Sequence, residues 1–203
     1  MERLQPNPDR RIAKTRQIIY ETFISLISEK EFTQISIKDI THQANISRST
    51  FYSHYQDKYD LLDKTIQEKL SELNELLMKS KSDYMNYESN IDIPDPYFVT
   101  FFEHLAKNNK FYHIMFTKMD SSEFLSKMFE VIRESFYIRV SSMEKDQKLL
   151  VPLEILLDYS SSSILGITKV WVESNMIYAS HYMALQLTRL AIMGLYKTMG
   201  KMN

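Results

Sequence analysis

Apolar residues recur three and four positions apart along almost the whole chain, and few residues interrupt that pattern. The 203 residues include only three glycines and five prolines. Spacings of three and four give a helix one apolar face, whereas a half-buried strand would alternate at every second residue. We therefore expect an all-α fold with short connections between the helices.

Charge and cysteine content exclude several classes of protein. The chain has no cysteine, so we expect no disulfide framework, thiol nucleophile or cysteine-based zinc site. Residues 1–56 hold 8 basic against 6 acidic residues and the remainder 17 against 20, an excess too small to indicate nucleic-acid binding by itself. The N-terminus lacks the apolar stretch of a signal peptide, and no window approaches the roughly 18 apolar residues of a membrane span. We expect a cytoplasmic protein with no membrane partner.

The first predicted helix runs from Asp9, its expected N-cap, to about Glu29. Its apolar stripe consists of Ile12, Ile19, Phe23, Leu26 and Ile27, and basic residues crowd its start at Arg10, Arg11, Lys14 and Arg16. Cations at a helix N-terminus oppose the macrodipole by a few tenths to about 1 kcal/mol. The cluster therefore indicates either a nearby anion or a solvated face.

Two short helices, each with its own start signal, follow the first. Ser36 opens a capping box of the form S-x-x-D and a helix to Ala44, and Ser47 caps a second helix through about His54. Asn45 occupies the turn between them, where a left-handed backbone is common. Helices of about two turns cannot stand alone, so we expect this pair to pack on longer helices.

The remaining start signals divide the chain. Another box at Asp57–Asp60 opens a long helix that reaches roughly Ser82. The sequence thus predicts a helix-turn-helix domain over 1–56, a connecting helix over 57–82 and a helical domain over 83–203. We expect helices in that last domain at about 96–108, 110–117, 121–145, 152–175 and 180–200, the first of them opened by Asp95 and Pro96.

The segment SIKDITHQANISRSTFYSHYQDKYDL, from Ser36 to Leu61, resembles the N-terminal signature of TetR-type transcriptional regulators, T-x-x-D-I-x-x-x-A-x-V-S-x-x-T-F-Y-x-H-F-x-x-K-x-x-L. The resemblance covers about residues 10–65. It implies a DNA-binding three-helix domain followed by a helical bundle for ligand binding and dimerisation. Two positions depart from the family, which usually has glycine where this chain has Glu31 and Asn45. A left-handed Glu31 would cost on the order of 1 kcal/mol.

The exposed start of the second short helix is the end that reaches base edges in a helix-turn-helix protein. Arg48 is the best base-reading candidate, because a guanidinium can bond guanine O6 and N7 together. Phe51 and Tyr55 are expected to be core. The predicted DNA-binding residues are Ser36, Ile37, Ser47, Arg48, Ser49, Thr50, Tyr52, His54 and Lys58.

The resemblance implies phosphate contacts for part of that set. Tyr52 and His54 occupy positions that touch backbone phosphates in the family, while Lys58 lies in the first turn of a helix whose free N–H groups favour an anion. In the alternative interpretation, Tyr52 covers the helix pair and His54 is an ordinary surface histidine.

TetR-type regulators form homodimers through their last two helices, which implies the same for this chain. Small residues at Ser160–Ser163 and Gly166 would let a partner helix approach closely, unless the serines form a loop. Ile164, Leu165 and Trp171 would add area. The last helix offers a dimer face or core at Leu185, Leu187, Leu190, Ile192, Gly194 and Leu195.

Aromatic and methionine side chains concentrate in the middle of the chain, where they could line a pocket for a small apolar effector or simply form the core. Met119, Phe124 and Phe129 belong to the same region. The predicted lining residues are Phe98, Phe101, Phe102, Phe111, Tyr112, Met115, Phe116 and Met128.

Catalysis and metal binding have no support in the sequence. There is no glycine-rich phosphate loop and no G-x-S-x-G motif. His104 and His113 lie nine residues apart, and no i, i+4 pair of histidine or acidic ligands makes a metal site. We therefore predict no enzyme, no metal and no cofactor. The sequence favours a DNA-binding regulator, with a repressor first and a coregulator or activator acting through a partner protein as the alternative.

Overall fold

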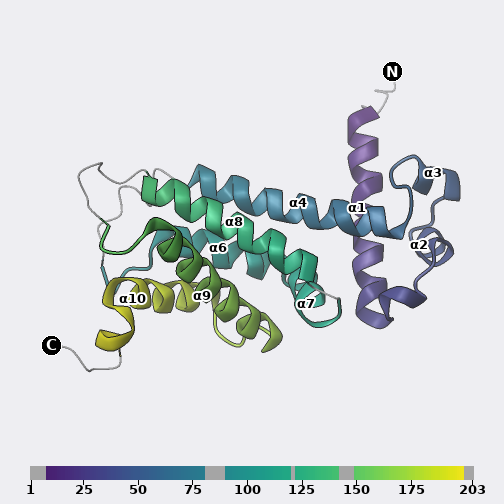
Figure 1. Cartoon of the computed structure of the whole chain (residues 1–203). Helices are drawn as coiled ribbons and strands as arrows, with labels where there is room; N and C mark the ends of the chain where they lie inside the picture. Colours follow the sequence, from purple (N-terminus) through teal and green to yellow (C-terminus); the bar gives the residue numbers. More distant parts are fainter. Residues whose placement is uncertain (1–7, 81–89, 120–121, 142–148, 199–203) are drawn as a thin grey trace, which may run out of the picture. The chain divides into compact units, whose positions relative to one another are not determined.

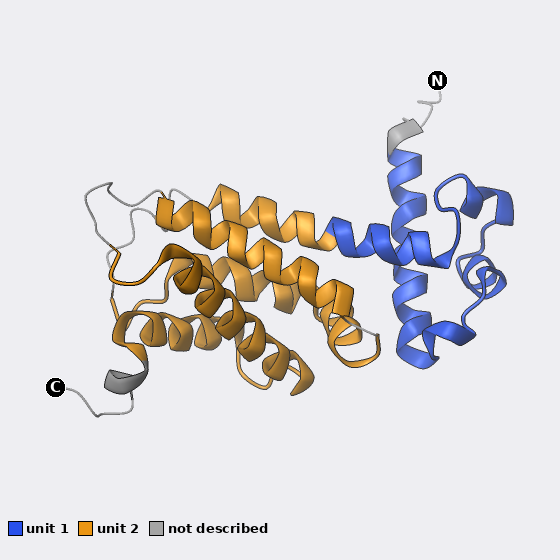
Figure 2. Ribbon diagram, in the orientation of Figure 1, with its two compact units in different colours: residues 1–68 blue, residues 69–203 orange. Residues whose placement is uncertain are grey.

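The computed structural model describes residues 8–80, 90–119, 122–141 and 149–198, apart from the side chains of 8–9 and 195–198. Within these ranges every regular element is a helix (Figure 1), which confirms the all-α prediction. The chain forms two compact units, residues 1–68 and 69–203, and the division falls inside one long helix (Figure 2).

In unit 1 the first of two short helices packs against a long helix, and the second packs against the first. The elements of this unit are α1 (Pro8–Glu29), the 3-10 helix η1 (Phe32–Gln34), α2 (Ile37–Gln43), α3 (Arg48–Tyr52) and the first part of α4 (Lys58–Lys79). The predicted stripe on α1 is buried from Ile19 to Ile27, but Ile12 is 45% exposed. Its neighbours Arg10, Arg11 and Lys14 are exposed as well, so the start of α1 has no buried face.

The predicted start signals of the short helices are confirmed. Ser36 and Asp39 form a complete capping box on α2, and the Ser47 side chain accepts a hydrogen bond from the Thr50 amide at the start of α3. Asn45 has φ 52°, the expected left-handed turn. Glu31 does not need such a backbone, because it is the N-cap of η1, two residues after the end of α1, and is extended at φ −61°, ψ 137°.

The described part of unit 2 is a bundle of the end of α4 with α6 (Pro96–Lys107), α7 (Asn109–Thr117), α8 (Ser122–Ser141), α9 (Leu153–Glu173) and α10 (Ser180–Thr198). Helix α6 packs against α10, and both α7 and α8 pack against α9. Aromatic rings fill the space between them in edge-to-face pairs, such as Phe102 with Trp171 at 5.2 Å between ring centroids.

One buried carboxylate ties three helices of unit 2 together. Asp95 caps α6 through the Tyr97 amide, its own amide donates to Thr188 on α10, and its carboxylate pairs with Arg139 on α8. Arg139 also lies over the ring of Tyr97. Pairing and hydrogen bonding are what make a buried charge tolerable.

The last two helices differ in part from their predicted roles. Ser160–Ser163 are helical, so the loop alternative is excluded. Ile164 and Trp171 are buried within unit 2 and cannot add area to an outer face. Helix α10 kinks at Gly194, where φ is 65°. Leu187 is buried, Leu190 and Ile192 are exposed, and the Leu195 side chain lies outside the described residues. No described helix is long and apolar enough to cross a membrane.

Candidate nucleic-acid interface

The apolar side of helix α3 is buried in unit 1. Phe51 is fully buried, and its ring contacts that of Tyr55, which is also buried. The turn before α3 is closed by the Ile46 amide, which donates to the Thr41 carbonyl. Both aromatics are therefore core, as predicted, and the opposite side of α3 is left to solvent.

The outer side of α3 carries Arg48, Ser49 and Tyr52, all of them exposed. Within the described part of the chain, the Arg48 guanidinium has no hydrogen-bond or ion-pair partner. The Tyr52 ring packs edge to face against Phe51, and the residue is 54% exposed. An arginine on the exposed first turn of such a helix can reach base edges.

The serine and threonine hydroxyls of the predicted set already have local partners. The Ser47 hydroxyl lies 2.8 Å from those of both Ser49 and Thr50. Ser36 donates to the Asp39 carboxylate through its amide and its hydroxyl, and these bonds lower the pKa of Asp39. The first role of Ser36 and Ser47 is therefore to cap α2 and α3. Ile37, which follows Ser36, is half-buried.

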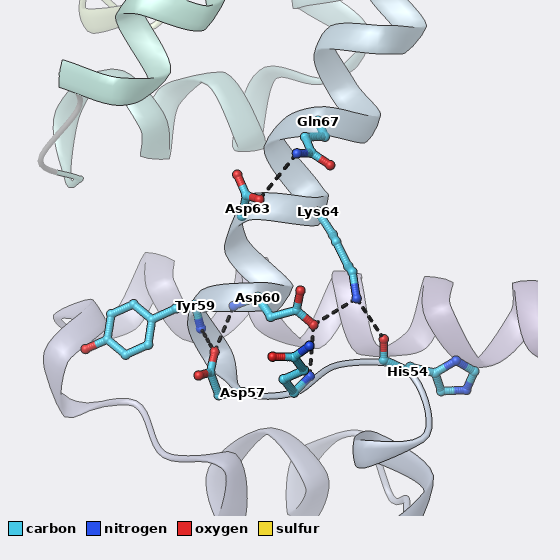
Figure 3. A network of polar contacts seen from close by, with 8 residues as sticks. His54, Asp57, Tyr59, Asp60, Asp63, Lys64 and Gln67 are labelled. Carbon is cyan, nitrogen blue, oxygen red and sulfur yellow. Dashed lines mark hydrogen bonds and ion pairs between the residues drawn. The ribbon is translucent and has the colours of Figure 1, made fainter.

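A polar network fixes the corner between α3 and α4 (Figure 3). The Asp57 carboxylate accepts from the amides of Tyr59 and Asp60, which makes it the N-cap of α4. The Asp60 carboxylate accepts from the Gln56 amide and from Lys64. The predicted box is thus shifted by one residue, because its return bond comes from Gln56 instead of Asp57.

His54 lies at the same corner, half-buried, and its ring points away from Lys64 in Figure 3. Burial lowers the pKa of His54, and the positive charge of Arg16 on α1 adds to that effect. The neutral ring is therefore favoured, and it could meet a phosphate through one N–H donor without a full charge.

Lys58 has partners other than the predicted phosphate. Its ammonium donates to the carbonyls of Phe32, Thr33 and Ile35 at 2.8, 3.1 and 2.8 Å. All three acceptors are backbone atoms in the connection between α1 and α2.

Sequence reasoning passed over Lys38, which is exposed in the first turn of α2 next to Ile37. It borders a pocket of about 330 Å³ that also involves the end of α1. The sequence could have indicated this position, because Lys38 comes two residues after the predicted Ser36 cap and so falls in the first turn of the helix. The pocket is lined by Leu26, Lys30, Lys38, Asp39, His42 and Gln43.

Two family models match the chain. One, described as bacterial regulatory proteins of the tetR family, matches residues 19–65. The other, a transcriptional regulator C-terminal region, matches residues 92–193, half of the chain. The chain belongs to the TetR family of transcriptional regulators.

Known TetR-type and related regulators are similar to the chain over different lengths. HTH-type transcriptional regulator YxbF of Bacillus subtilis is 41% identical over 66 residues, which are 32% of this chain and 17% of that protein. The activator DhaS of Lactococcus lactis is 28% identical over 102 residues, 50% of this chain and 49% of that protein. The chain thus spans half or less of these two relatives. A TetR transcriptional regulator from Streptococcus agalactiae has 26% identity, a TM-score of 0.61 and coverage of 91% and 96% of the two chains.

In this TetR-family regulator, α2 and α3 are the helix-turn-helix, and the residues predicted to line a pocket all lie in unit 2. All eight are buried and several pack ring against ring, among them Phe101 with Phe102 and Phe111 with Tyr112. His104 is buried beside them, and its Nε2 lies 3.0 Å from the Tyr112 hydroxyl. The described residues hold no cluster of three histidine, cysteine or acidic side chains that could bind a metal.

Proposed function

We propose that this TetR-family regulator is a cytoplasmic homodimer that binds a palindromic operator through α3 and represses transcription until a small apolar effector releases it. The observation that carries the proposal is Arg48, exposed and unpartnered among the described residues, on a helix whose inner side is buried and whose N-terminus is capped. A preorganised helix gives up little conformational freedom when it enters the major groove.

An exposed apolar stripe on α9 supports a dimer. Ile155, Tyr159 and Val170 are 60, 67 and 63% exposed and recur at helical spacing. Gly166 lies on the same stripe, with no neighbouring atom within 4 Å of where a Cβ would be. Exposed apolar patches of this kind mark interaction sites. A two-fold partner would present a second α3, which must lie about 34–36 Å from the first to reach successive major grooves.

The composition of unit 2 supports an apolar effector. Its interior is packed with phenylalanine, tyrosine and methionine side chains, of which methionine adapts most readily to a ligand, with the His104–Tyr112 pair as a polar group among them. An effector that binds better when the two recognition helices have another spacing would shift the dimer away from DNA.

Activation is the second candidate for the sign of regulation, because the relative DhaS is named as an activator of the dhaKLM operon. A regulator of that kind would act through a partner protein. Transcription in vitro from a promoter carrying the operator separates the two: added protein lowers transcript in the first case and raises it in the second.

The DNA-binding proposal is tested with Arg48→Ala and an operator selected from random duplexes. We expect the variant to lose about 1–3 kcal/mol of discrimination between operator and scrambled duplex in each half-site, while still forming dimers in light scattering. Arg48→Lys keeps the charge but not the two-pronged geometry, so it should keep affinity for scrambled DNA. Unchanged discrimination in Arg48→Ala would remove Arg48 from base reading.

A further inference from the structure

The ammonium group of Lys58 is fully engaged within unit 1. A lysine ammonium has three N–H donors and no acceptor, and the three carbonyls of Phe32, Thr33 and Ile35 lie within 3.1 Å of its nitrogen. The rings of Phe32 and Tyr59, which contact each other edge to face, also lie near this nitrogen, with centroids 4.7 and 5.5 Å from it. A phosphate could bind Lys58 only by displacing some of these contacts.

The three carbonyls belong to the segment that sets the start of α2. Phe32 and Thr33 lie in η1, and Ile35 immediately precedes Ser36, the N-cap of α2. Carbonyls at the end of a helical turn carry partial negative charge, and a cation placed there stabilises them. Lys58 is the first residue of α4, so its side chain connects the beginning of one helix to the beginning of another.

We propose that Lys58 is a positioning residue: it clamps the connection 32–35 to the first turn of α4 and thereby places Ser36 and Ile37 for DNA, without contacting DNA itself. This assignment replaces the phosphate contact expected from the sequence. Only its effect on DNA affinity rests on the proposed function, because the clamp is present in the free protein and can be measured there.

A clamp and a phosphate contact differ in their response to salt. Each phosphate neutralised by a lysine adds about 0.9 to the slope of log K against log salt concentration. A clamp adds nothing to that slope, although its loss weakens binding by displacing the residues it holds.

The first test is Lys58→Met, which keeps most of the side-chain stem and removes the charge. We expect weaker operator binding with an unchanged salt slope, and faster hydrogen exchange of the amides of residues 35–40 in the free protein. Lys79→Met is the matched control, because Lys79 is an exposed lysine on the same helix, and its one ion-pair partner among the described residues is Glu75. It should alter neither exchange nor slope. A slope lower by about 0.9 in Lys58→Met, with normal exchange, would overturn the clamp.

For Lys58→Arg, a clamp and a phosphate contact predict opposite results. A guanidinium binds phosphate at least as well as an ammonium, so a phosphate contact would survive the change. The planar guanidinium cannot direct three donors at three converging carbonyls. In the Lys58→Arg variant we therefore expect faster hydrogen exchange of the amides of residues 35–40 and weaker binding to the operator. Normal exchange and normal binding would contradict the proposal.

A measurement on the unmodified protein covers the case in which these variants do not fold. The NMR signals of the Lys58 side chain should keep their chemical shifts when the operator is added, because the ammonium stays on its carbonyls. Displacement of those signals by operator would overturn the proposal. If the protein binds no DNA, the function proposed above fails, while hydrogen exchange in Lys58→Met still decides the clamp.

Discussion

Different interactions stabilise the helices within each of the two units. In unit 1 the helix starts and the connections before them are fixed by side chains that bond to backbone: Ser36, Ser47, Asp57 and Lys58. In unit 2 the helices are held by aromatic side chains that pack edge to face, with a few fully buried polar groups among them.

This difference predicts how each unit responds to substitution. A capping side chain lies near the surface, and its loss exposes a backbone group that water can partly satisfy, typically at about 1 kcal/mol. A buried charge has no such alternative, and removal of its partner costs several times more. Substitution of the capping side chains of unit 1 should therefore be mild, and substitution of the buried polar groups of unit 2 severe.

Asp95→Ala should show the largest effect. It removes the cap of α6 and leaves the mostly buried Arg139 without its carboxylate, so we expect a loss of about 3–5 kcal/mol in the free energy of unfolding. Urea denaturation measures it. Asp92→Ala is the control, because Asp92 is an exposed carboxylate paired with the partly exposed Arg189, and it should lose no more than about 1 kcal/mol. Equal losses in the two variants would break the comparison between buried and exposed pairs.

The second prediction concerns pH. Burial lowers the pKa of His104 to about 4 from its ordinary value of 6.5. Between these values the unfolded chain takes up a proton that the folded chain excludes, so stability is complete above pH 6.5 and falls as pH drops toward 4. The full loss is about 3 kcal/mol.

His104→Gln should remove that part of the pH dependence, measured as the difference in unfolding free energy from the wild type between pH 7 and 4.5. His181→Gln is the matched control at an exposed histidine of unit 2 and should keep the wild-type profile. A His104→Gln profile parallel to that of the wild type would show that His104 is charged in the fold.

The smallest effect is expected at the left-handed turns, which occur in both units. Asn45 in unit 1 has φ 52° and Asn175 in unit 2 has φ 55°. Alanine at either position should cost about 1 kcal/mol and glycine about nothing, since only glycine adopts this backbone without strain. Thermal unfolding of the alanine and glycine variants at each position measures these losses. A much larger loss at Asn175 would mean that this turn also depends on its packing in unit 2.

The start signals of unit 1 could be predicted because they are local. A serine three residues before an aspartate, or an asparagine in a tight turn, specifies its own hydrogen bonds within one turn of chain. For Glu31 the sequence indicated that a left-handed backbone would be strained and that α1 could end differently, and the extended Glu31 followed by η1 is such a different end.

Long-range contacts explain what the sequence did not show. The partners of Lys58 lie 23 to 26 residues away in the chain, and no spacing rule connects a lysine to carbonyls at that separation. The sequence likewise gives no sign of the contact between Asp95 and Arg139, although it did predict Asp95 as the N-cap of α6. For α9, periodicity indicated a helix with small residues but not which side faces inward, so Trp171 and Ile164 were assigned to the wrong side.

The position of Trp171 has a practical consequence. It is the single tryptophan of the chain, and its indole N–H donates to the Tyr178 carbonyl at the corner between α9 and α10. The indole emission of this protein therefore originates in unit 2 alone. Emission that stays constant while circular dichroism loses helix would identify unfolding of unit 1, and a spectral shift on adding a small molecule would locate its effect in unit 2.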